Sequence, residues 1–190
     1  MRRPDFVLAL ALLAAASLTA APARADGADN CQMQISNPAV DYGSTTRAEL
    51  LKKQVSPLAM SLGRQSVTLF ATCKVPTLMT LFFHGAADNA DTYRLGNGGA
   101  FTLRVLNARL DGHVVGLGSV MVPGQQPETQ AESVILRPDT GAVPILNDVP
   151  VKGSSLQLQV DIDAVISTTG SRVNDLTVFR GAGNFELFEH

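Results

Sequence analysis

The sequence predicts an all-β domain built as an antiparallel β-sandwich, and three observations lead to this prediction. Short runs of alternating apolar and polar residues recur along the 190-residue chain, giving about nine or ten strand candidates at intervals of roughly ten residues. Turn-forming residues separate these runs, and the chain contains 16 glycines and 10 prolines. Charged residues make up only 17% of the sequence, which is low for the exposed faces of a helix bundle.

The strand candidates share an apolar or alternating pattern and are bounded by turn residues. They are Gln32–Ser36, Val40–Gly43, Gln65–Cys73, Thr77–Phe83, Phe101–Val105, Val114–Val122, Ser133–Leu136, Ser155–Ile166, Leu176–Phe179 and Asn184–His190. The connections predicted from Gly, Pro, Asn and Asp are a turn at Val75–Pro76, a long loop at Gly85–Gly99, a hairpin turn at Asp111–Gly112, a polar loop at Gln125–Glu132 and an edge segment at Pro138–Pro150.

One helix is predicted, over Thr45–Val55. Thr46 can cap its first turn, and Glu49 stands three residues later as the partner in a capping box. Pro57 ends the segment. We expect one or two helical turns that connect two strands.

The first 25 residues have the features of a secretory signal peptide. Two arginines precede an apolar run over residues 7–18, and small residues follow at positions 23–25. The run is too short to span a bilayer, which disfavours the alternative of a retained anchor helix. We therefore predict that residues 1–25 are a signal peptide and that residues 26–190 form a single domain.

Export determines how the two cysteines, Cys31 and Cys73, are interpreted. In an oxidising compartment they most simply form one disulfide, which would close a loop of about 43 residues and contribute roughly 4 kcal/mol. A metal site is disfavoured because no CxxC pair or nearby histidine accompanies them. The formal net charge of −2 also argues against a nucleic acid or an anionic membrane surface as a partner.

No group of residues in the sequence supports catalysis. The histidines His84, His113 and His190 lack ligand partners at helical spacing, and no hydrolase or phosphate-binding motif is present. The stretch 88–91 lacks the glycine and the glutamate of a calcium loop. Asp161 and Asp163 fall on the solvent side of a strand. We expect no enzymatic activity, no metal and no cofactor.

The last residues, Asn184–His190, form an apolar strand with no element after it. Phe185 and Leu187 fall on one face, and Phe188 is out of phase with them. Such a strand either completes a sheet or lies beside a position where another strand is missing.

Several features together resemble the subunits of chaperone–usher pili, in particular those of the β-fimbria type. Cys31 is followed by a short strand and by Asp-Tyr-Gly at 41–43, and Cys73 ends the run Val-Thr-Leu-Phe-Ala-Thr-Cys. The stretches at 76–83, 93–96 and 110–112 and the terminal strand are also similar.

The resemblance implies an immunoglobulin-like β-sandwich that lacks its last strand, with the disulfide joining the first two strands. The open groove would be filled by a strand from a periplasmic pilus chaperone and then by one from another pilus subunit, after passage through an outer-membrane usher. Phe185, Leu187 and Phe188 would form the groove wall and the chaperone-docking strand. The protein would be exported to the cell surface as part of a fimbrium and contribute to adhesion or biofilm formation.

Two features depart from the family pattern. The last aromatic residue is Phe188, where the family usually has a penultimate tyrosine. Only residues 26–30 separate the predicted cleavage site from Cys31, which leaves no room for a donor strand. We therefore expect a tip or terminal subunit.

Three alternatives remain open at this point. The exposed loops could bind a receptor on a host or another surface. The chain could instead be a free-standing secreted or periplasmic β-sandwich, such as a ligand-binding or coat protein, with all its strands present. An unrecognised hydrolase is the third alternative.

Overall fold

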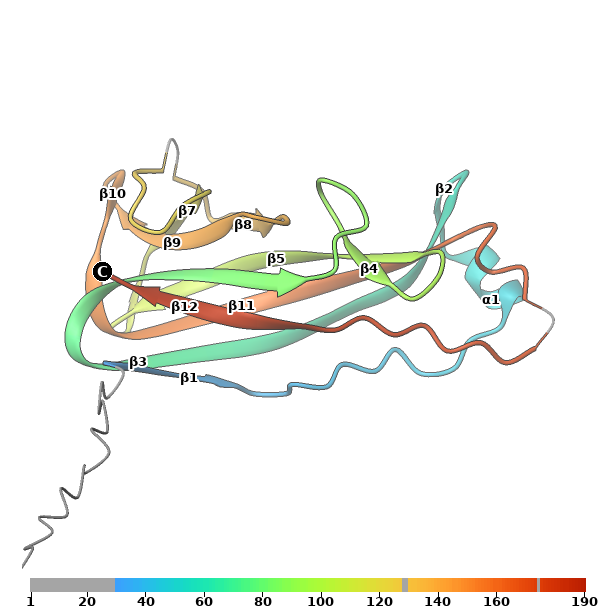
Figure 1. Cartoon of the computed structure of the whole chain (residues 1–190), viewed down its shortest axis with the longest axis horizontal. Helices are drawn as coiled ribbons and strands as arrows, with labels where there is room; N and C mark the ends of the chain where they lie inside the picture. Colours follow the sequence, from blue (N-terminus) through green and yellow to red (C-terminus); the bar gives the residue numbers. More distant parts are fainter. Residues whose placement is uncertain (1–29, 128–129, 174) are drawn as a thin grey trace, which may run out of the picture.

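One long strand, β3 (Ala59–Gly85), belongs to both layers of the fold. Its first half pairs with β1 (Cys31–Ile35) and with β11 (Lys152–Ser167), and its second half pairs with β12 (Gly183–Glu189) and β9 (Gly141–Leu146). Figure 1 shows β3 bending back on itself at one end of the molecule, so that its two halves lie in different layers.

The computed structural model describes residues 30–127, 130–173 and 175–190. The predicted signal peptide therefore lies outside the described residues. The remaining elements are α1 (Arg47–Lys52), β2 (Gln54–Ser56), β4 (Tyr93–Leu95), β5 (Gly99–Leu110), β6 (His113–Val114), β7 (Gly116–Val120), β8 (Ser133–Leu136) and β10 (Val149–Pro150). In the described part of the chain, no helix is long and apolar enough to span a membrane.

The strands form two layers in which the pairs are antiparallel. The first layer runs β1-β3-β11-β5-β4, and the second contains β12, the second half of β3, β9, β7 and β10. Inward side chains of both layers, such as Val160 of β11 and Leu81 of β3, belong to one hydrophobic core. The predicted fold class, an all-β immunoglobulin-like antiparallel sandwich with an open edge and one disulfide, is confirmed.

The bend in β3 replaces the turn that was predicted at Val75–Pro76. The strand continues through these residues, and the β3–β11 register shifts between Gly153 and Ser155, so that positions 74–76 have no partner on β11. A proline is tolerated here because its missing N–H is not required by a neighbouring strand.

The predicted helix is present but shorter than expected. Thr46 is its N-cap, and both hydrogen bonds of the capping box with Glu49 are formed. The helix ends at Lys52, and the next residues form β2, so the predicted extension to Val55 is wrong. Short-range capping decides where the helix starts, whereas pairing of β2 with β3 decides where it stops.

The structure corrects four other predicted segments. The loop predicted at Gly85–Gly99 contains β4, which pairs with β5. The segment Pro138–Pro150 contains β9, which is buried and pairs with β3, β7 and β10, so it is not edge material. Val40–Gly43 and Leu176–Phe179 are not strands.

The hairpin predicted at Asp111–Gly112 is confirmed. These two residues have φ values of 50° and 82° and connect β5 to β6, whose register pairs Leu110 with His113. Positive φ at both central residues is the geometry of a type I′ turn, which suits the twist of the two strands.

Candidate functional site

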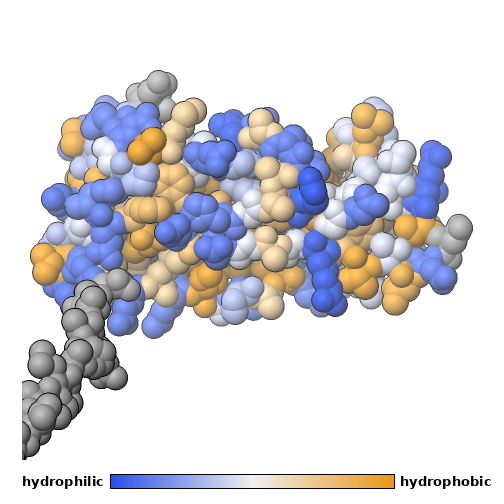
Figure 2. Space-filling view, viewed as in Figure 1, coloured by the Kyte–Doolittle hydropathy of each residue, from blue (hydrophilic) through white to orange (hydrophobic). Residues whose placement is uncertain are grey.

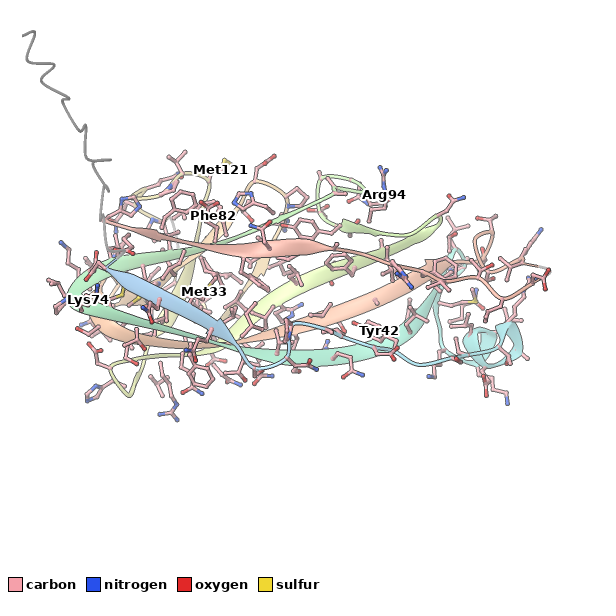
Figure 3. The ribbon with its side chains drawn as sticks, turned by 60° about the horizontal axis from the view of Figure 1, so that its bottom comes forward. Met33, Tyr42, Lys74, Phe82, Arg94 and Met121 are labelled. Carbon is pink, nitrogen blue, oxygen red and sulfur yellow. A yellow bond between two sulfur atoms is a disulfide. The ribbon has the colours of Figure 1, made fainter. Side chains whose placement is uncertain are left out.

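Two strands of the sandwich have an edge that no other described strand covers. Both β1 and β12 pair with β3 on one side only, and no pairing joins β1 to β12. Figures 1 and 3 show them as edge strands of the two layers, on the same side of the molecule. We call the uncovered edges of β1 and β12 the open edge.

The backbone of β1 directs polar groups to the open edge. Asn30 and Ser36 bond to β3, through Lys74 N–H to the Asn30 carbonyl and Ser36 N–H to the Thr68 carbonyl, both at 2.9 Å. Antiparallel pairing alternates the direction of the backbone groups from one residue to the next. The N–H and C=O groups of Cys31, Met33 and Ile35 therefore point away from β3.

The same alternation applies to β12. Leu78 and His190 exchange two backbone hydrogen bonds, of 3.1 and 3.0 Å. Counting back from His190 in steps of two, Phe188, Glu186 and Asn184 also direct their backbone groups to β3. The N–H and C=O groups of the residues between them, Glu189, Leu187 and Phe185, therefore point toward the open edge. The two strands thus direct rows of backbone donors and acceptors to the same opening.

The side chains of the open edge are apolar and half-covered. Met33 and Ile35 of β1 and Phe185 and Leu187 of β12 pack against the main hydrophobic core but remain partly exposed. Inward residues of the central strand β11, such as Val160, are fully buried. The core is therefore closed over the middle of the sandwich and open between β1 and β12.

The apolar row continues beyond the two strands. Val40 and Tyr42 follow β1, and Phe179 precedes β12; all three pack partly exposed on the same core. Figure 3 shows Met33 beside β1 and Tyr42 farther along the segment that follows this strand. The Tyr42 hydroxyl donates to the Ile162 carbonyl at 2.7 Å, and burial, together with the charge of Asp163, raises the pKa of Tyr42 to about 12.

Of the three residues predicted for the groove wall, Phe185 and Leu187 face the open edge and Phe188 does not. Phe188 lies on the opposite face of β12, where its ring contacts Phe82 edge-on at a centroid distance of 5.4 Å. It belongs to a second, smaller hydrophobic cluster under β7 and β9. This placement agrees with the phase of Phe188 in the sequence.

Aromatic contacts anchor β12 to the core. The ring of Phe185 lies 4.9 Å from that of Phe83, which also contacts Tyr93 at 4.8 Å and Phe101 at 6.1 Å. These residues come from four separate strands, so their meeting was not evident from local sequence patterns. They hold one wall of the open edge in place.

One end of the open edge is tied by a side chain. Glu189 of β12 accepts a hydrogen bond from the backbone N–H of Cys31 at 2.9 Å. Cys31 is also bonded to Cys73, directly opposite on β3, with a Cα–Cα distance of 3.9 Å. The disulfide is the predicted one, whereas the role of Glu189 was missed because its partner lies 158 residues away in the chain.

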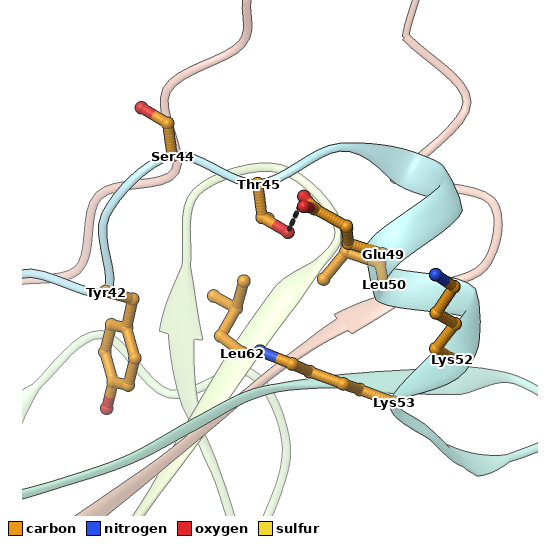
Figure 4. Close-up of a pocket in the computed structure, with 8 residues that line it drawn as sticks. All are labelled: Tyr42, Ser44, Thr45, Glu49, Leu50, Lys52, Lys53 and Leu62. Carbon is orange, nitrogen blue, oxygen red and sulfur yellow. Dashed lines mark hydrogen bonds between the residues drawn. The ribbon is translucent and has the colours of Figure 1, made fainter.

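A polar cavity of about 280 Å³ lies near α1, at the other end of the molecule (Figure 4). Tyr42 and Leu62 form part of its wall, with Lys52 and Lys53 on the helix side. The Glu49 carboxylate is held by Thr45 and Thr46, which lowers its pKa.

The remaining polar residues that the sequence singled out lie outside the open edge. His84 and Glu186 form an exposed ion pair of 2.7 Å if the histidine is protonated, on the outer face of β12. Asp163 pairs with Arg64, but Asp161 is only 5% exposed, so its prediction as a surface residue is wrong. Among the described residues, no cluster of three metal-ligating side chains is present.

Exposed apolar residues also occur at the end that carries α1 and β2. Leu51, Val55, Leu58 and Leu176 are each at least 47% exposed, and Figure 2 shows apolar residues on this end of the molecule. They belong to connecting segments and short elements rather than to a continuous sheet edge.

No family model and no curated protein matches the sequence. Among solved structures, the P pilus rod subunit PapA is similar, with a TM-score of 0.44 and 12% sequence identity over 85% of this chain and 99% of that chain. This similarity is low, and the function proposed below rests on the open edge.

Proposed function

We propose that the open edge receives a β-strand from another polypeptide, and that the protein is a structural subunit of a chaperone–usher surface fibre. The observation that carries this proposal is the coincidence of two features between β1 and β12. Backbone groups of both strands point to the same opening, and half-buried apolar side chains lie beneath it. An added strand would satisfy the backbone groups and cover the core.

The two walls run in opposite directions. Both are antiparallel to β3, and β3 reverses direction between its two halves, so β1 and β12 are antiparallel to each other. A strand placed between them is therefore parallel to one wall and antiparallel to the other. Its inward side chains should be apolar and should alternate with polar ones.

The proposed partners follow from this mode of binding. A periplasmic chaperone would supply the strand before assembly, and another subunit would supply it in the fibre after passage through the outer-membrane usher. An uncovered edge of this kind is prone to aggregate, which gives such a chaperone a physical role. The fibre would serve surface adhesion or biofilm formation.

A strand fused to the chain tests the proposal directly. A turn of about four residues after His190, followed by an alternating Val/Thr strand, would run antiparallel to β12 and alongside β1. Because three or more apolar side chains become buried, the melting temperature should rise by about 10 °C or more. The matched control carries Ser at the inward positions and should leave the melting temperature unchanged. Equal melting temperatures for the two fusions would overturn the proposal.

The terminal position in the fibre, which the short segment before Cys31 predicts, needs a separate test. The purified chain would be mixed with a rod subunit encoded beside it, after both have been released from chaperone. We expect this chain to accept the partner's strand and not to insert a strand of its own. Fibres in which its N-terminal segment occupies the partner's groove would contradict the terminal position and leave the strand-accepting role intact.

A further inference from the structure

We infer that Glu189 closes one end of the open edge and thereby sets the register of the strand that binds there. This inference rests on the proposed function, because it concerns where an added strand can pair. Glu189 acts as a positioning residue, because it bonds to the backbone N–H of Cys31 in one wall of the site.

The first step concerns which backbone groups remain available. Cys31, Met33 and Ile35 alternate with residues bonded to β3, so their N–H groups point to the open edge. The N–H of Cys31 already donates to the Glu189 carboxylate at 2.9 Å. An added strand cannot use this donor without displacing a charged acceptor, which makes a stronger hydrogen bond than a peptide carbonyl.

The second step concerns space. A strand inserted between two walls requires two inter-strand spacings, about 9.5 Å in all. At Cys31 the two walls are bridged by one glutamate side chain through a single hydrogen bond of 2.9 Å, so an added backbone at this level would have to displace that side chain. The disulfide to Cys73 and the backbone bonds between His190 and Leu78 fix both sides of this bridge on β3.

The third step gives the register. Because the walls are antiparallel and Cys31 stands opposite Glu189, moving two residues along each wall brings Met33 opposite Leu187. Two further residues bring Ile35 opposite Phe185. The Met33–Leu187 level is thus the first that an added strand can occupy, and the strand extends from there toward Tyr42 and Phe179.

Amide hydrogen exchange and peptide affinity test this inference. The probes are a synthetic peptide of about ten residues with alternating Val and Thr, and the same peptide lengthened by about two residues at each end. In the unmodified chain, the short peptide should protect the amides of Met33 and Leu187 and leave the exchange of the Cys31 amide unchanged. The ratio of long-peptide to short-peptide affinity in the unmodified chain is the reference value for the variants.

In Glu189→Ala, the Cys31 amide should become protected only when peptide is bound. The ratio of long-peptide to short-peptide affinity should rise by about fivefold, which corresponds to one additional net hydrogen bond. Glu189→Gln retains an acceptor but loses the charge, so its affinity ratio should lie between those of the unmodified chain and Glu189→Ala. Glu186→Ala is the matched control, because Glu186 belongs to the same strand but contacts His84 on the outer face.

The outcomes separate this inference from the proposed function. One outcome would contradict the inference alone. In it, peptide protects the amides of Met33 and Leu187 in every variant, but Glu189→Ala and Glu189→Gln show the same affinity ratio and the same exchange of the Cys31 amide. Glu189 would then not set the register. If no peptide protects Met33 and Leu187 in any variant, the strand-accepting function itself is overturned. If Glu189→Ala does not fold, the unmodified chain still provides a test. A change in the exchange rate of its Cys31 amide on peptide binding would contradict the inference.

Discussion

Asp161 is a carboxylate that the fold buries and then surrounds with donors. Ser66 donates to it at 2.6 Å and Gln159 at 2.8 Å, and a guanidinium nitrogen of Arg64 lies 3.7 Å away. Burial by itself would raise the pKa of Asp161, but these hydrogen bonds and the charges of Arg64 and Arg104 lower it below its usual value. The ionised form is therefore favoured in the folded state.

Asp161→Asn should lower the free energy of unfolding by about 1–3 kcal/mol at pH 7, the cost of disturbing hydrogen bonds to a buried charge. A group whose pKa is lowered on folding stabilises the protein above its unfolded pKa of about 3.9, and this contribution is lost as the pH falls through the folded pKa. The difference in free energy of unfolding between the unmodified chain and Asp161→Asn, measured with urea, should therefore shrink as the pH falls from 5 to about 2. Asp163→Asn, at an exposed ion pair, should cost less than about 1 kcal/mol. If the difference in free energy of unfolding between the unmodified chain and Asp161→Asn does not change with pH, this account is contradicted.

Tyr42 and Tyr93 are the chain's two tyrosines, and burial raises the pKa of each to about 12, with smaller contributions from the charges of Asp163 and Asp139. The unfolded chain ionises near pH 10. The two neutral tyrosines therefore contribute a part of the folding free energy that is fully present below pH 10 and is lost as the pH rises toward 12. Tyrosinate absorbance should rise near pH 10 in urea and about two units later in buffer. Tyr42→Phe should weaken the alkaline loss of stability, and native titration near pH 10 would refute the prediction.

At the scale of elements, β1 depends on the disulfide. It is an edge strand of five residues, paired on one side only, and Cys31–Cys73 ties its first residue to β3 across a sequence separation of 42. Apart from Cys31 itself, the side chains that β1 adds to the core, Met33 and Ile35, are only partly buried. The covalent bond thus compensates for the short length of this wall.

Replacing both cysteines by alanine should lower the free energy of unfolding by about 2–4 kcal/mol, chiefly because the unfolded chain gains freedom. The amides of Gln32 and Gln34, which face β3, should exchange much faster, since β1 would fray. Gln159 of the central strand β11 is the internal control and should keep its protection relative to global unfolding. If the amides of Gln32 and Gln34 keep their protection without the disulfide, pairing with β3 alone holds β1 in place.

Local patterns predicted the elements whose cause is local. Alternation located β1, β11 and β12, a short apolar run located β8, and the capping box located the start of α1. Failures occurred where distant pairing decides the outcome. Pro76 indicates a turn between two strands, whereas the chain reverses there by a bend within the single strand β3. Pro144 indicates an edge, yet β9 is flanked on both sides. Leu176–Phe179 has a strand-like composition but no partner strand among the described residues. For the same reason the sequence could predict that Phe185 and Leu187 share one face of the terminal strand, but not the contact of Glu189 with Cys31.

At the scale of the whole molecule, the open edge consists of two strands, β1 and β12, that pair with β3 on one side only. Such edges tend to pair with one another. We expect the purified chain to associate in a concentration-dependent manner in sedimentation velocity, and we expect the fusion carrying the Val/Thr strand to remain monomeric. The fusion with Ser at the inward positions should associate like the unmodified chain. A chain that stays monomeric at hundreds of micromolar, with open-edge amides exchanging freely, would contradict this prediction.

The continuity of β3 also has a mechanical consequence. Both walls of the open edge are hydrogen-bonded to this one strand, on opposite sides of its bend. Tension applied through a strand held between the walls would load their backbone hydrogen bonds in shear, in parallel, and would pass from both walls into β3. Near the bend, the Cys31–Cys73 bond carries part of this load covalently. A pulling force on the bound strand would therefore strain β3 and the disulfide before it separates the two layers of the sandwich.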